Sequence, residues 1–203
     1  DANVAQMQEG RHPCQQRLAF EELLAHYLSL RSLRALAATE SAFALEQGQD
    51  RVDRFIADLP FELTAAQSRV VDEILLDLSQ PHPMMRLIQG DVGSGKTVVA
   101  AIACLKAIAG GVQAAIMAPT EILAEQHWRN FSDWFEPLGI EPAWLSGSQK
   151  AAARRESLAA IADGRAQLIV GTHALFQEGV EFDNLALVVI DEQHRFGVHQ
   201  RMA

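Results

Sequence analysis

The chain has 203 residues, of which 49% are hydrophobic and 21% are charged, and these globular proportions exclude a largely disordered protein. Its 17 basic and 26 acidic side chains give a formal net charge of −9, which argues against a domain that holds nucleic acid by bulk charge alone. No run of about 18 uncharged apolar residues occurs, and the first residues do not resemble a signal peptide, so we expect a cytoplasmic protein without a membrane span.

Residues 1–60 are predicted to form an α-helical linker region. Apolar side chains recur at three- and four-residue spacings over 15–36, which is typical of an amphipathic helix. A second helical stretch is expected over 35–47, ending near Gly48, and a third over 52–59, ending before a proline. The region contains no cluster of site-like residues, so we interpret it as a linker that packs on its neighbour.

From residue 61 onward, helices and strands alternate. Thr64 is predicted to cap the first helix, over 65–78. The later elements are expected, in chain order, as a strand over 84–88, a helix over 97–109, a strand over 114–118, a helix over 122–135, a strand over 143–145, a helix over 149–162, and strands over 168–170 and 187–190. Apolar strands that alternate with helices indicate an α/β fold, a parallel sheet with helices on both faces.

A glycine-rich segment follows the first predicted strand and leads into a helix. It matches the phosphate-binding pattern G-x-x-x-x-G-K-[ST] without a gap, with Gly90, Asp91, Val92, Gly93, Ser94, Gly95, Lys96 and Thr97. Glycines allow backbone N–H groups to surround phosphate oxygens, and the helix N-terminus adds positive potential. We expect Lys96 to reach the β- and γ-phosphates of ATP, and Thr97 to place its hydroxyl on Mg²⁺. A glycine-rich turn with a chance lysine is the alternative.

Two carboxylates follow the last predicted strand. Asp191 is expected to hold Mg²⁺ through water at the carboxyl end of that strand, and Glu192 to polarise the attacking water as general base. Two exposed acids at a strand end are the alternative. Gln193 and His194 are predicted to sense the γ-phosphate and to relay it toward a DNA-binding side; for His194 a local turn hydrogen bond is equally compatible.

Neither cysteines nor histidines form a zinc pattern. Cys14 and Cys104 are far apart in the sequence, so both are expected to be reduced thiols. Cys104 lies in an apolar helical run and is expected in the core. His194 and His199 with Asp191 do not have the spacing of a zinc site.

The phosphate loop together with Asp-Glu-Gln-His at 191–194 resembles helicase superfamily 2. The chain is further similar to the RecG family of branch-migrating DNA helicases over five segments, at 61–67, 84–97, 117–127, 171–177 and 191–199. The resemblance covers essentially the whole chain. It implies a P-loop NTPase fold: residues 61–203 as a first RecA-like motor lobe, truncated before the second lobe, after the helical linker.

The resemblance implies roles for residues that the pattern leaves open. Gln67 matches the glutamine that reads the adenine edge in such enzymes, although the residue alone would favour a helix-surface position. Phe61 either packs near the base or belongs to the core. In the family a second lobe supplies arginine fingers, so we expect these 203 residues alone to bind nucleotide weakly and to be nearly inactive.

Strand-end loops are the expected DNA contacts, because hydroxyl and backbone N–H groups suit a phosphate and read no sequence. The candidates are Pro119, Thr120, Gly171, Thr172 and His173, together with Gly147 and Ser148. Ordinary turn chemistry is the alternative for them. The basic cluster of Lys150, Arg154 and Arg155 is more typical of a solvated helix face.

The function implied by the resemblance is an ATP-dependent DNA helicase that remodels stalled replication forks and Holliday junctions in recombination and repair. Its cofactors would be ATP and Mg²⁺. It would act as a monomer on branched DNA, and a single-stranded-DNA-binding protein is a partner through the family alone. The alternatives are the motor lobe of a replication-restart or transcription-coupled repair translocase, and a nucleotide-binding module without motor activity.

Overall fold

The computed structural model describes residues 12–37, 39–91 and 93–192. The chain divides into two compact units, one of Asp1–Ala42 with Pro81–Met85 and the other of Phe43–Gln80 with Arg86–Ala203. The phosphate loop and the strand that precedes Asp191 both belong to the second unit.

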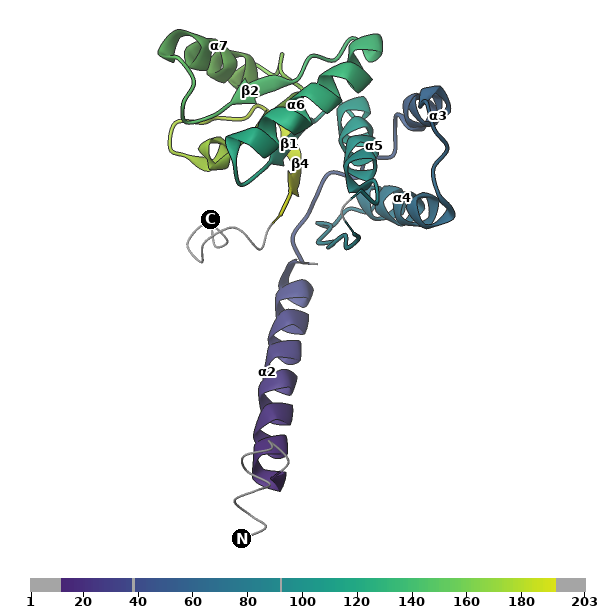
Figure 1. The fold of residues 1–203 in the computed structure, drawn as a ribbon, viewed down its shortest axis with the longest axis vertical. Helices are drawn as coiled ribbons and strands as arrows, with labels where there is room; N and C mark the ends of the chain where they lie inside the picture. The colour runs from purple at the N-terminus through teal and green to yellow at the C-terminus, as the bar shows by residue number, and fades with distance from the viewer. Residues whose placement is uncertain (1–11, 38, 92, 193–203) are drawn as a thin grey trace. The chain divides into compact units, whose positions relative to one another are not determined.

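The first unit contains one long helix, α2, which spans Pro13–Ala37 (Figure 1). It confirms the helix predicted over 15–36, and it begins at a proline whose missing N–H would have no partner in the first turn. Its large apolar side chains are 41–70% exposed; they are Leu18, Phe20, Leu23, Leu24, Tyr27, Leu28 and Leu30. None of the helices formed by the described residues is long and apolar enough to cross a membrane.

The second helical stretch, predicted over 35–47, is wrong beyond Ala37, where α2 ends. Residues 41–46 have no regular structure, because their backbone groups bond elsewhere. The N–H of Leu45 donates to the carbonyl of Leu78 at 2.9 Å, and the Leu45 side chain is buried. Long-range bonds therefore replace the local helical bonds that the apolar spacing suggested.

The second unit is built on a parallel sheet with the strand order β2-β3-β1-β4. Its strands are β1 Gln113–Met117, β2 Ala143–Leu145, β3 Leu168–Gly171 and β4 Leu185–Ile190. Strands β1 and β3 are buried along their whole length, as expected for central strands of a sheet covered by helices. The predicted α/β class is confirmed, and the carboxyl ends of the strands form one edge of the sheet.

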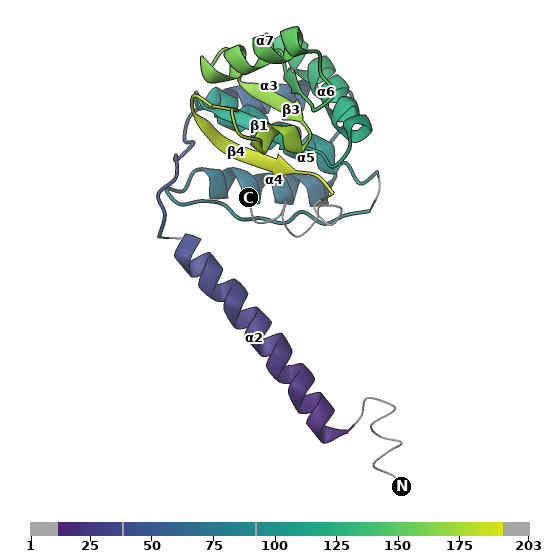
Figure 2. The ribbon, with the colours of Figure 1, turned by 90° about the vertical axis from the view of Figure 1, so that its left-hand side faces the viewer.

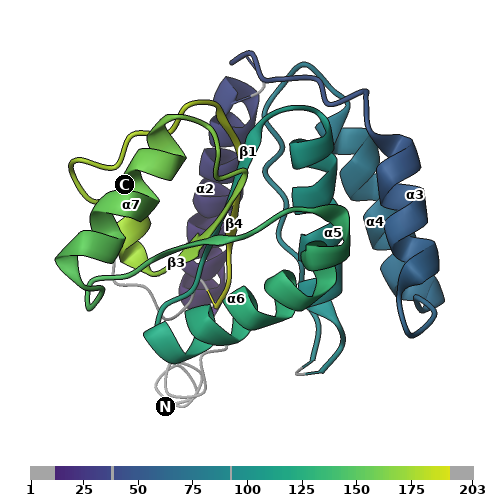
Figure 3. The same ribbon diagram turned by 90° about the horizontal axis from the view of Figure 1, so that it is seen from above.

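Helices accompany this sheet in the second unit. They are α3 Gln49–Asp58, α4 Ala65–Leu78, α5 Lys96–Ala109, α6 Glu121–Phe135 and α7 Ala151–Ala162, with short 3₁₀ turns η1 Glu136–Leu138 and η2 His173–Phe176. Helix α5 packs on β1 and β4, α6 on β3, and α7 on β2; α5 and α7 lie on opposite sides of the strands (Figure 3). Helices α3 and α4 pack on α5, so α3 belongs to the second unit.

The strand predicted over 84–88 is not formed. Arg86, in the middle of this segment, pairs with Asp77 at 2.7 Å and with Glu73, both on α4. These ion pairs hold the segment to α4, and Leu87 stays 71% exposed. Among the described residues β4 therefore has one sheet neighbour, β1, as Figure 2 shows.

The two cysteines are expected to differ sharply in reactivity. Cys104 is fully buried in α5, and this burial raises the pKa of its thiol, whereas Cys14 is exposed at the start of α2. Because the thiolate is the reacting species, iodoacetamide should label Cys14 in the native protein and leave Cys104 unmodified until denaturant is added. Mass spectrometry of the tryptic peptides checks this. Equal native labelling would contradict the burial of Cys104.

Candidate nucleotide-binding site

The phosphate loop joins the irregular segment after α4 to the first turn of α5. Gly93 and Gly95 have φ values of +82° and +79°, in the left-handed region that favours glycine. A Cβ on Gly95 would lie 2.3 Å from Nε2 of Gln67, and one on Gly90 would lie 2.6 Å from Oγ of Ser94. Close neighbours thus disfavour a side chain at Gly90 and Gly95, whereas Gly93 has open space around it and is favoured by its positive φ alone. These glycines form a cradle that fits a backbone wrapped around phosphate.

Lys96 is the first residue of α5 and folds back over the loop. Its Nζ donates to the carbonyl of Gly90 at 2.7 Å and to that of Asp91 at 3.0 Å. Its charge also helps to lower the pKa of Asp191 across the sheet edge. Thr97 follows in the same turn and is half-buried. This donor set, an ammonium, a hydroxyl and an ionised carboxylate, fits a nucleotide phosphate with Mg²⁺.

Gln67 connects α4 to the phosphate loop. Its Oε1 accepts from the N–H of Thr64 at 2.7 Å, and the Thr64 hydroxyl accepts from the N–H of Gln67 at 3.2 Å, which completes a capping box. Its Nε2 donates to the carbonyl of Ser94 at 2.9 Å. One hydrogen on Nε2 and one lone pair on Oε1 remain for a ligand, so the adenine contact stays a prediction.

Phe61 is not a core residue. Its side chain is 44% exposed and lines an open depression of about 530 Å³ between the end of α3 and the start of α4. The depression also includes Leu59, Pro60 and Ser68. Of the two interpretations given by the sequence, the structure therefore excludes packing in the core; a contact with the base stays a prediction.

Asp191 follows β4, and hydrogen bonds hold both its backbone and its carboxylate. Its N–H donates to the carbonyl of Met117 at the end of β1, at 2.9 Å. One carboxylate oxygen lies 2.7 Å from Nε2 of His127, and the other accepts from the N–H of Glu192 at 3.0 Å. The hydrogen bond from His127 is the main cause of a lowered pKa of Asp191, which partial burial opposes. The carboxylate is therefore ionised, as a ligand of a cation must be.

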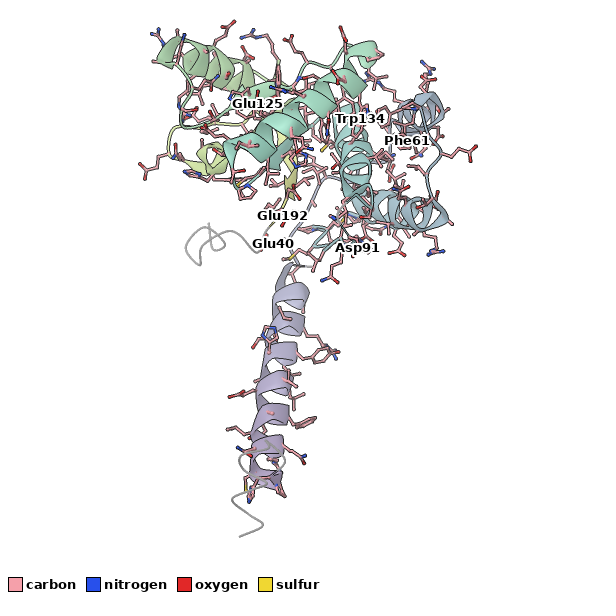
Figure 4. All side chains as sticks on the ribbon, viewed as in Figure 1. Glu40, Phe61, Asp91, Glu125, Trp134 and Glu192 are labelled. Carbon is pink, nitrogen blue, oxygen red and sulfur yellow. The ribbon has the colours of Figure 1, made fainter. Side chains whose placement is uncertain are left out.

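Glu192 has a φ of +50°, and it is the one non-glycine residue with positive φ in the part of the chain that the structure describes. For a residue with a Cβ this left-handed conformation costs about 1–2 kcal/mol. It turns the chain sharply where β4 ends. Glu192 and Asp91 of the phosphate loop lie toward the same end of the second unit (Figure 4).

The predicted DNA-contact residues are brought to the carboxyl edge of the sheet, but they differ in exposure. Thr120 is exposed and caps α6, with its hydroxyl accepting from Leu123 N–H at 3.3 Å. Thr172 is only 3% exposed, and its hydroxyl accepts from Ala174 N–H within its own turn. Turn chemistry thus accounts for the Thr172 side chain. Pro119 is half-buried and His173 is exposed.

Gly171 is explained by packing within the sheet. A Cβ at this position would lie 2.0 Å from the carbonyl oxygen of Leu145 on β2. That oxygen also accepts from the N–H of Thr172 at 3.3 Å. Close approach of two strands therefore requires glycine here, whether or not the loop contacts DNA.

His127 is the site residue that sequence reasoning did not single out. It lies 64 residues from Asp191 in the sequence, and its ring nitrogen reaches the carboxylate only because α6 and the end of β4 come together in the folded unit. No local spacing links the two residues. Val92, Gln193 and His194 lie outside the described residues.

Comparison with known proteins gives three results. A family model described as DEAD/DEAH box helicase matches residues 64–203. The ATP-dependent DNA helicase RecG of Haemophilus influenzae is 57% identical over 100% of this chain, and that of Escherichia coli strain K12 is 58% identical over 98%. The chain spans 29% of the length of each of these relatives.

Solved structures of helicases are also similar to this chain. A RecG bound to a three-way DNA junction is 42% identical, with a TM-score of 0.82, and it matches 90% of this chain and 25% of that chain. The UvsW helicase of bacteriophage T4, at 17% identity and a TM-score of 0.56, shows a shared fold alone. The chain therefore belongs to the DEAD/DEAH box helicase family, within which it is similar to the RecG helicases over its whole length.

Proposed function

We propose that this chain is the nucleotide-binding lobe of an ATP-dependent DNA helicase that remodels stalled replication forks and Holliday junctions in recombination and repair. The observation that carries the proposal is the convergence of the glycine cradle, Lys96 and Asp191 at the carboxyl edge of one parallel sheet. Similarity to RecG helicases, one of them solved on a branched DNA, supports branched DNA as the substrate.

Each residue has a distinct task in hydrolysis. Lys96 exchanges its two loop carbonyls for phosphate oxygens and offsets their charge. Glu192 accepts a proton from the water whose oxygen attacks the γ-phosphorus, while the bond to the ADP oxygen breaks. Thr97 and Asp191 would hold Mg²⁺, which supplies Lewis-acid stabilisation of charge on the phosphates when bound.

Coupling to DNA requires contacts at the same sheet edge. Pro119, Thr120 and His173 are the side chains we propose for the DNA backbone, with Gln193 and His194 relaying the state of the γ-phosphate. Gly171 and Thr172 would act through backbone position only, since their side-chain sites are filled by packing. Residues 1–60 would connect this lobe, 61–203, to the rest of a protein that works as a monomer, and α3 within them would anchor the linker by packing on α5. A single-stranded-DNA-binding protein would be its partner.

The proposal is tested by ATP hydrolysis of the full-length protein on forked DNA, linear duplex and single-stranded DNA. We expect the fork to stimulate hydrolysis most strongly, and EDTA to abolish it because the phosphate charge is then uncompensated. Equal stimulation by linear duplex would point instead to a general duplex translocase. ATP binding without hydrolysis on any DNA would point to a nucleotide-binding module.

A further inference from the structure

Helix α6 presents a polar side chain on its apolar face. Ala124, Phe131 and Phe135 on this face are fully buried, and His127 lies between the first two at helical spacing. Its side chain is 13% exposed. The ring of Phe131 packs edge-on against the imidazole, with centroids 6.5 Å apart and an interplanar angle of 72°. The imidazole orientation is therefore fixed by packing before any ligand is considered.

The fixed ring is aimed at a single acceptor. Nε2 of His127 lies 2.7 Å from Oδ2 of Asp191. An ionised carboxylate only accepts, so the hydrogen of this bond is on Nε2. Nδ1 is buried and has no hydrogen-bond partner among the described residues, so the Asp191 carboxylate is the one hydrogen-bond partner of the imidazole in this part of the chain.

The hydrogen bond from His127 helps to restrict the Asp191 carboxylate to one orientation. Oδ2 is held by His127 and Oδ1 by the N–H of Glu192, while the backbone of Asp191 is held by Met117 on β1. A carboxylate offers about four lone-pair directions, so about two remain free and point in directions set by the protein. Without His127, the Oδ1 bond alone would leave the side-chain torsion free to change.

We propose that His127 is a positioning residue that orients the Asp191 carboxylate for Mg²⁺, an inference that rests on the proposed ATPase function. Outer-shell hydrogen bonds of this kind typically change metal affinity or activity by about 10–100-fold when removed. His127 touches neither nucleotide nor the reacting water; it acts through Asp191. The same contact joins α6, which Thr120 caps, to the nucleotide site.

The test compares His127→Met with His127→Gln in the full-length protein. Glutamine retains an N–H donor of similar reach, whereas methionine has similar length without a donor. Mn²⁺ binding to the protein–ADP complex, measured by electron paramagnetic resonance, should weaken by about 10–100-fold in His127→Met and recover largely in His127→Gln. The Mg²⁺ concentration that half-activates hydrolysis should shift in parallel, while KM for ATP at saturating Mg²⁺ changes little.

Controls separate positioning from general destabilisation. His82→Leu alters an exposed histidine outside the site and should leave every readout unchanged. Thermal unfolding of each variant shows whether it is folded. If His127→Met does not fold, the test rests on His127→Gln. Loss of Mn²⁺ affinity in a folded glutamine variant overturns the proposal. Unchanged Mn²⁺ affinity in a folded methionine variant also overturns it.

The variant Asp191→Asn separates a failure of the role proposed for His127 from a failure of the proposed ATPase function. If Asp191→Asn loses Mn²⁺ affinity and hydrolysis while His127→Met keeps both, only the role of His127 is wrong. If Asp191→Asn itself keeps both, the proposed function of the site fails.

Discussion

Replacing Glu192 with glutamine is expected to abolish ATP hydrolysis and to spare ATP binding. The amide has the shape of the carboxylate but cannot accept a proton from water, so kcat should fall by about 10²–10⁴-fold. The glycine loop and Lys96, which we propose as the phosphate-binding groups, are unchanged by this substitution. Phosphate release by the full-length protein on forked DNA measures the first effect, and the dissociation constant of a fluorescent ATP analogue measures the second.

A matched control for this variant is Glu178→Gln, which removes the same charge at an exposed position to which no role in the site is assigned. It should hydrolyse ATP like the parent protein. Substantial hydrolysis by Glu192→Gln would mean that another group activates the water. Loss of ATP binding would mean that Glu192 contributes to holding ATP before hydrolysis begins.

Gly171→Ala is expected to destabilise the sheet rather than to weaken DNA binding specifically. The added Cβ would lie 2.0 Å from the carbonyl oxygen of Leu145 and 3.2 Å from Cγ of Leu175, and two paired strands cannot separate without losing hydrogen bonds. Overpacking of this kind costs about 1–3 kcal/mol and occasionally more. Faster amide hydrogen exchange in peptides that cover β2 and β3 would report it.

Gly147→Ala provides the comparison, because nothing lies within 4 Å of a Cβ at that position in the neighbouring strand-end loop. It should leave exchange in β2 and β3 unchanged. If Gly171→Ala instead left exchange unchanged and reduced DNA affinity, the glycine would serve a DNA contact and the packing explanation would be wrong.

Local signals determined how well the elements were predicted. The helix over 65–78 is confirmed at both ends, and its start is marked by the Thr64–Gln67 capping box, which lies within four consecutive residues. The strand over 143–145 is likewise confirmed. The failures at 35–47 and 84–88 have the opposite cause: Leu45 bonds to Leu78, and Arg86 to α4, and neither partner can be read from the apolar pattern.

The candidate site likewise contains features that local sequence predicts and features that depend on tertiary packing. The phosphate loop was predictable because its eight residues are consecutive in the sequence. Its pattern calls for glycine where the backbone has a positive φ, and Gly93 and Gly95 have positive φ values in the structure. The His127–Asp191 pair was not predictable, since two elements must pack before the residues meet. The burial of Thr172 also depends on packing, because a threonine after a strand looks the same whether its hydroxyl faces solvent or its own turn.

If Glu192 is the general base that we propose, its left-handed backbone favours glycine for stability, whereas hydrolysis requires its carboxylate. Glycine at this position would relieve about 1–2 kcal/mol of conformational strain, so the substitution that best suits the turn removes the carboxylate altogether. A search for thermostable variants would therefore tend to select inactive proteins at residue 192. Stability engineering of this lobe should hold that position fixed and seek its gains elsewhere.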